Sequence, residues 1–131
     1  MPTLPSAPAP ARPVRLVDSI GELRPGDAGC IAVSGSHGGL SAGRYAMAVQ
    51  PWLSVFNDAG IGKGDAGVAG LALLQHQGLA ACTVAHTSAC IGEARSTLDE
   101  GVVSHANAAA RALSVVPGEP CRQLVERLVR V

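Results

Sequence analysis

The sequence predicts an α/β protein, a small three-layer fold with a mostly parallel central sheet of three to five strands. Three runs, residues 30–33, 52–56 and 79–84, carry apolar residues on both alternating sets of positions and are bounded by turn residues. Strands that are covered on both faces have this composition. Helical patterns separate the runs, and a parallel return requires a crossover of about this length. We therefore expect these three strands to be parallel and central.

Shorter elements complete the N-terminal half. Residues 14–17 fit a short strand, and Ser19 and Glu22 have the spacing of a capping box over a single helical turn. Helices are expected over residues 41–50 and 66–77. Gly78 follows the second of these helices and is suited to its C-terminal cap.

The C-terminal half has one strong helical pattern and two weaker segments. Residues 91–100 are mixed in character and are expected to form a loop. Ser104 is a natural N-cap for an alanine-rich helix over residues 106–113, and His105 and Asn107 are either site groups or capping polar residues. Apolar residues recur at helical spacing over residues 121–129, which predicts an amphipathic helix.

Length and composition favour one domain, residues 14–131, preceded by a disordered Pro- and Ala-rich tail over residues 1–13. Ten basic and ten acidic residues give no net charge, and no basic cluster alternates with aromatic residues, so we expect no nucleic-acid partner. No apolar run is long enough for a membrane span, and we expect a cytoplasmic protein. Since 47% of residues are hydrophobic and 15% charged, we also expect a homo-oligomer.

The four cysteines do not resemble a secreted disulfide framework and are expected to be reduced core residues. Cys82, His86 and Cys90 recur every four residues, but a strand should end between them. Equal sequence spacing then gives no shared geometry, so we predict no metal site. The sequence identifies no cofactor.

The loop after the first apolar run permits three interpretations. Small-x-Ser-x-Gly, between a strand and a helix, is the setting of a nucleophile elbow and would expose Ser36 as a nucleophile. Alternatively, the main-chain amides of this loop form an anion cradle at the start of the next helix. The third interpretation is a flexible turn. The residues concerned are Ser34, Gly35, Ser36, His37, Gly38 and Gly39.

The loop after the second run contains the only lysine of the chain, Lys63, among glycines. Residues 62–67 satisfy G-x-G-x-x-G, but the acidic residue that a dinucleotide site requires is missing, as is the spacing of a Walker A loop. We assign Asp65 to the cap of the next helix and Asp58 to chemistry. Lys63 and the loop amides would bind an anion, or the loop is a solvated turn. The candidate ligand-binding residues here are Asn57, Gly60, Gly62 and Gly64.

Polar residues follow all three predicted strands, and the carboxyl ends of parallel strands meet at one sheet edge. The groups concerned are Ser34, Ser36 and His37, then Asn57 and Asp58, then His86, Thr87 and Ser88. The leading hypothesis is a hydrolase or lyase of a small anionic metabolite, with Asp58, Lys63, Ser36 and His86 as catalytic candidates. The alternative is a non-catalytic ligand-binding or assembly subunit.

Overall fold

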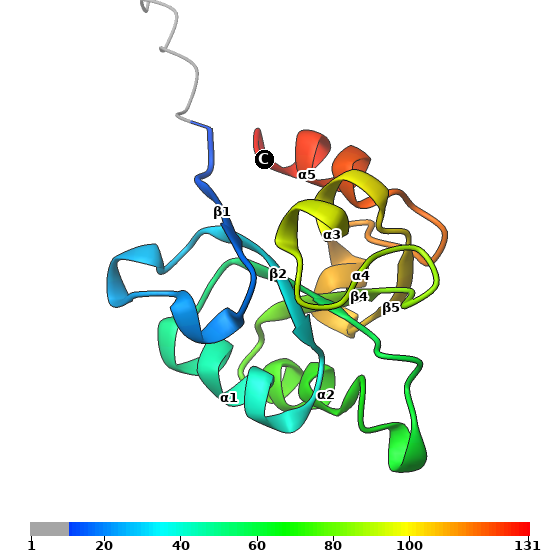
Figure 1. Cartoon of the computed structure of the whole chain (residues 1–131). Helices are drawn as coiled ribbons and strands as arrows, with labels where there is room; N and C mark the ends of the chain where they lie inside the picture. Colours follow the sequence, from blue (N-terminus) through cyan, green and yellow to red (C-terminus); the bar gives the residue numbers. More distant parts are fainter. Residues whose placement is uncertain (1–10) are drawn as a thin grey trace, which may run out of the picture.

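The computed structural model describes residues 11–131 and has a five-stranded sheet with helices on both faces (Figure 1). The strands lie in sequence order across the sheet, with β1 to β4 parallel and β5 antiparallel to β4. The α/β fold class and the central parallel strands are therefore confirmed. The strands are β1 (Val14–Val17), β2 (Ile31–His37), β3 (Leu53–Asn57), β4 (Ala80–Val84) and β5 (Val103–Ala106).

Two helices cover one face of the sheet and three cover the other. Ala32, Phe56 and Ala81 belong to a buried cluster with α1 and α2, whereas Ile31 and Val55 pack in a second cluster with α4 and α5. Alternate strand residues point to opposite faces, so β3 and β4 are buried at every position and β2 at its first five. The helices are α1 (Leu40–Val49), α2 (Ala69–His76), α3 (Ala94–Glu100), α4 (Ala108–Ala112) and α5 (Cys121–Leu128).

Several local predictions are confirmed. Ser19 and Glu22 form the expected capping box around η1 (Ile20–Glu22). Gly78 has φ +69° just after α2, as a C-terminal cap requires. The apolar stripe of residues 121–129 forms α5, which buries Leu124 and Leu128.

The first ten residues of the predicted tail lie outside the described residues. Arg12 and Pro13, which were assigned to the same tail, contact the domain. The Arg12 guanidinium lies 3.8 Å from the centroid of the Trp52 ring, and the Arg12 amide donates to the carbonyl of Val129. The Ile31 amide donates to the carbonyl of Pro13. No helix in residues 11–131 has both the length and the apolar character that crossing a membrane requires.

Three secondary-structure predictions made from the sequence are wrong. Residues 94–100 form α3 instead of loop, because the carboxylate of Asp18 accepts the Ala94 amide at 2.9 Å and caps the helix from a distant segment. Residues 103–106 form β5, and Asn107, not Ser104, is the N-cap of α4. The helix expected from residue 66 begins at Ala69, after the turn η3 (Lys63–Asp65).

Candidate functional site

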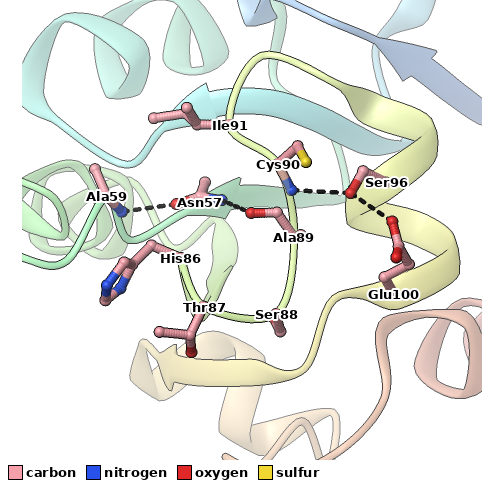
Figure 2. Close-up of a pocket in the computed structure, with 10 residues that line it drawn as sticks. All are labelled: Asn57, Ala59, His86, Thr87, Ser88, Ala89, Cys90, Ile91, Ser96 and Glu100. Atoms are coloured by element: carbon pink, nitrogen blue, oxygen red, sulfur yellow. Dashed lines mark hydrogen bonds between the residues drawn. The ribbon is translucent and has the colours of Figure 1, made fainter.

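A cavity of about 550 Å³ lies at the carboxyl edge of the parallel strands, beneath the loop that joins β4 to α3 (Figure 2). Cavities of this size accommodate small metabolites. Residues that follow β3 and β4 line it together with residues of α3, so distant segments of the chain meet there. The lining residues are Asn57, Ala59, His86, Thr87, Ser88, Ala89, Cys90, Ile91, Ser96 and Glu100.

Asn57 fixes the shape of the cavity from the end of β3. Its side chain is fully buried, and its amide Nδ2 donates to the carbonyl of Ala89 at 3.2 Å. Its Oδ1 accepts the main-chain amide of Ala59 at 2.8 Å. Both sides of the carboxamide are therefore used to join the loop after β3 to the loop after β4.

Asp58 and His86 form a hydrogen-bonded pair beside the cavity. Asp58 is 4% exposed, and its Oδ1 accepts the main-chain amides of Gly60 at 2.8 Å and of His86 at 3.1 Å. The same oxygen lies 3.3 Å from Nδ1 of the His86 ring, whose side chain is 55% exposed. A buried carboxylate thus fixes the main chain of His86 and lies beside its partly exposed ring.

Two opposing effects set the ionisation of Asp58. Burial raises its pKa, whereas hydrogen bonds from the main-chain amides of Gly60 and His86 and the nearby Ser104 hydroxyl lower it. The net result is a pKa below the usual value for this carboxyl. Asp58 is therefore ionised at neutral pH, and its charge lies beside Nδ1 of the His86 ring.

The opposite end of the cavity carries a carboxylate. The Cys90 amide donates to Oγ of Ser96 at 2.9 Å, and this hydroxyl donates to Oε1 of Glu100 at 2.8 Å. Figure 2 shows Ser96 and Glu100 on α3, on the side of the loop away from the His86 ring. Within residues 11–131, no Lys or Arg lines this cavity.

The structure brings together only part of the predicted site. Asn57 and His86 line the cavity, as do Thr87 and Ser88, and Asp58 lies directly behind His86. Gly60 has φ +75°, and a Cβ there would lie 3.5 Å from the His86 ring, so this glycine packs against the imidazole. Asp58 itself does not line the cavity and contacts it through His86.

The loop after the first apolar run contributes no lining residue. Ser36 lies inside β2, which continues to His37, and its Oγ accepts the amide of Ile20. The nucleophile-elbow interpretation is therefore wrong, since no strand–helix turn exposes this hydroxyl. Ser34 is fully buried and donates to the carbonyl of Val55.

Two glycines of the same segment, Gly35 and Gly38, contact other parts of the protein. Gly35 packs against the main chain of Gly92 and Glu93, which leaves no space for a side chain. The Gly38 amide donates to the carbonyl of Asn57, so it is not free to bind an anion. His37 is exposed at the end of β2 and does not line the cavity.

Lys63 is exposed in the η3 turn and is not among the residues that line the cavity. Asp65 does not cap α2, whose N-cap position is occupied by Val68. Gly62, Gly64 and Asp65 all have positive φ, and left-handed residues cannot continue an α-helix. The predicted cooperation of Lys63 with Asp58 at one site therefore lacks a geometrical basis.

Two lining residues, Ser96 and Glu100 of α3, were not predicted from the sequence. Their spacing of four residues would place both on one helical face, but α3 has no apolar stripe that identifies it as a helix.

The cysteines differ in their exposure: Cys90 is exposed, whereas Cys30, Cys82 and Cys121 are buried. In residues 11–131, no three His, Cys, Asp or Glu side chains are grouped so that they could hold a metal ion.

Comparison of the chain with protein-family models, curated proteins and solved structures finds no match. The geometry of the cavity is therefore the basis for the functional assignment.

Proposed function

We propose that this protein is a small hydrolase or lyase that acts on a metabolite bound at the carboxyl edge of the sheet. His86 is the general acid–base group, and Asp58 is the positioning residue that orients it. The observation that carries the proposal is the buried Asp58 carboxylate 3.3 Å from Nδ1 of His86, whose ring borders a cavity of about 550 Å³. A carboxylate that holds a histidine in this way is a recurring arrangement of acid–base catalysis.

The proposed chemistry begins with neutral His86. With a proton on Nδ1, facing Asp58, the imidazole accepts a second proton at Nε2 from a water molecule or from the substrate. The imidazolium is then stabilised by the ionised carboxylate and returns its proton to the leaving group. Proton removal from water leads to hydrolysis, and proton removal from the substrate leads to elimination.

The role that sequence analysis gave to Asp58 changes in this proposal. A carboxylate that is 4% exposed and does not line the cavity is poorly placed to contact a substrate. The expected anionic ligand depended on the loop of residues 34–39 and on Lys63, and none of these residues lines the cavity. Homo-oligomerisation and a cytoplasmic location stay predictions.

The alternative is a non-catalytic ligand-binding or assembly subunit. The hydroxyls of Ser88 and Ser96 each donate to a protein oxygen, so neither has its proton free for a substrate. Hydroxyls that bond only to other protein atoms are also what a cavity that binds a ligand without converting it would contain. An enzyme converts the molecule that it binds, whereas a binding subunit does not, so conversion distinguishes the two functions.

Incubation of the protein with a metabolite extract, followed by mass spectrometry, tests the proposal. We expect at least one metabolite to be converted by the parent protein, and Thr87→Trp to reduce that conversion by about tenfold or more because the larger side chain fills the cavity. Ser41→Trp, at an exposed position on α1 outside this cavity, is the matched control and should convert like the parent. Retention of a metabolite without conversion would support the binding subunit and contradict the enzyme. Equal conversion by Thr87→Trp would contradict the use of this cavity.

A further inference from the structure

We infer that the ligand of this cavity carries a positive charge, a protonated amine or guanidinium group that contacts Glu100. This inference rests on the proposed function, because it takes the cavity beside His86 as the ligand site. It concerns the end of the cavity that the acid–base pair does not occupy.

Glu100 is oriented toward this role by its neighbours. Oγ of Ser96 donates to Oε1 of Glu100 at 2.8 Å, and Ser96 itself is 7% exposed. Because the Cys90 amide donates to the same Oγ, the hydroxyl proton is directed to the carboxylate. One Glu100 oxygen is thereby held in place, and Oε2 has no protein partner among the hydrogen bonds of residues 11–131.

The charges of the residues that line the cavity favour a cationic ligand. In the described part of the chain, Glu100 is the only Asp or Glu that lines the cavity, and no Lys or Arg lining residue balances it. The second carboxylate, Asp58, is close behind His86 and is ionised, since its pKa is lowered. An anionic ligand would meet repulsion from both carboxylates, whereas a cation would be attracted to both.

The two ends of the cavity define the class of ligand. Figure 2 shows the His86 ring and Glu100 on opposite sides of the loop, with Ser88 and Ala89 between them. A molecule that uses both ends therefore has its cationic nitrogen separated from the group that reacts at Nε2 of His86. Apolar Ala89 and Ile91 also line the cavity and suit a short hydrocarbon linker between those two groups.

Three probes of matched length test the inference: butylamine, butanol and butyrate. Binding is measured from amide chemical shifts in nitrogen–proton correlation spectra of the full chain. We expect butylamine to cause saturable shifts in residues 86–100 and to bind more tightly than butanol, with butyrate weakest. Glu100→Gln should weaken butylamine binding by at least about threefold and abolish its preference over butanol.

Glu126→Gln is the matched control, since its carboxylate is 69% exposed on α5 and does not line the cavity. This variant should keep the parent affinity for butylamine. The inference is overturned if butylamine binds Glu100→Gln as tightly as the parent, if butyrate binds most tightly, or if no probe shifts residues 86–100.

Two separate readouts, butylamine binding and metabolite conversion, distinguish a failure of this inference from a failure of the proposed catalysis. If butylamine prefers the parent over Glu100→Gln while no metabolite is converted, the cation site stands and the proposed enzyme does not. If metabolites are converted but butylamine shows no preference for Glu100, only the cation site is refuted.

Discussion

Asn107→Ala is expected to lower the free energy of unfolding by about 4 kcal/mol, since four main-chain groups, three of them in buried hydrogen bonds, would lose their partner. Asn107 is 7% exposed, and its Nδ2 donates to the carbonyls of Leu71 at 3.2 Å and Leu79 at 2.9 Å. Its Oδ1 accepts the amides of Ala81 at 3.1 Å and Ala110 at 2.9 Å. One side chain thus joins α2, β4 and α4.

Urea unfolding followed by circular dichroism measures this effect. Gln123→Ala removes an exposed carboxamide from α5 and serves as the control, with an expected change within about 0.5 kcal/mol. An Asn107→Ala protein within about 1 kcal/mol of the parent would mean that water replaces these hydrogen bonds and that Asn107 is an ordinary cap.

His86→Gln is expected to reduce turnover of a metabolite identified by screening at least about a hundredfold, because general acid–base groups contribute about 10² to 10⁴ to rate. Glutamine retains a polar side chain at this exposed position but cannot take up a proton near neutral pH. Asp58→Asn should also reduce turnover, by about tenfold or more, since the amide no longer stabilises the imidazolium.

His76→Gln is the matched control for this series. His76 is exposed at the end of α2 and does not line the cavity, so its replacement should leave turnover unchanged. Rates are compared at neutral pH, with circular dichroism to check that each variant is folded. A His86→Gln protein that keeps more than about a third of parental turnover would refute the role of His86.

The layers of the fold were predictable because they depend on local patterns. Residues 30–33, 52–56 and 79–84 are apolar on both faces, and only a sheet covered on both sides accommodates such strands. The apolar stripe of α5 and the capping box of Ser19 and Glu22 were also predictable, because all the residues that form each pattern are close together in the sequence. Convergence of Asn57, Asp58 and His86 followed from parallel pairing alone.

The rest of the site depends on contacts between distant segments. α3 is capped by Asp18, which lies 76 positions away, so its own sequence does not identify it as a helix. Gly35 was interpreted as part of a ligand loop, but it is required because Gly92 and Glu93 pack against it. The partners of Asn107 lie in α2, β4 and α4, and no local pattern distinguishes such a residue from a surface cap.

The most direct test of the account is the tautomer of the neutral His86 ring, measured by long-range nitrogen–proton correlation spectra. Asp58 is ionised at neutral pH because its pKa is lowered, and its Oδ1 lies 3.3 Å from Nδ1 of the ring. We predict that neutral His86 carries its proton on Nδ1, and that Asp58→Asn reduces the share of this tautomer. A neutral ring with its proton on Nε2, unchanged by Asp58→Asn, would contradict the proposal that Asp58 prepares His86 for acid–base chemistry.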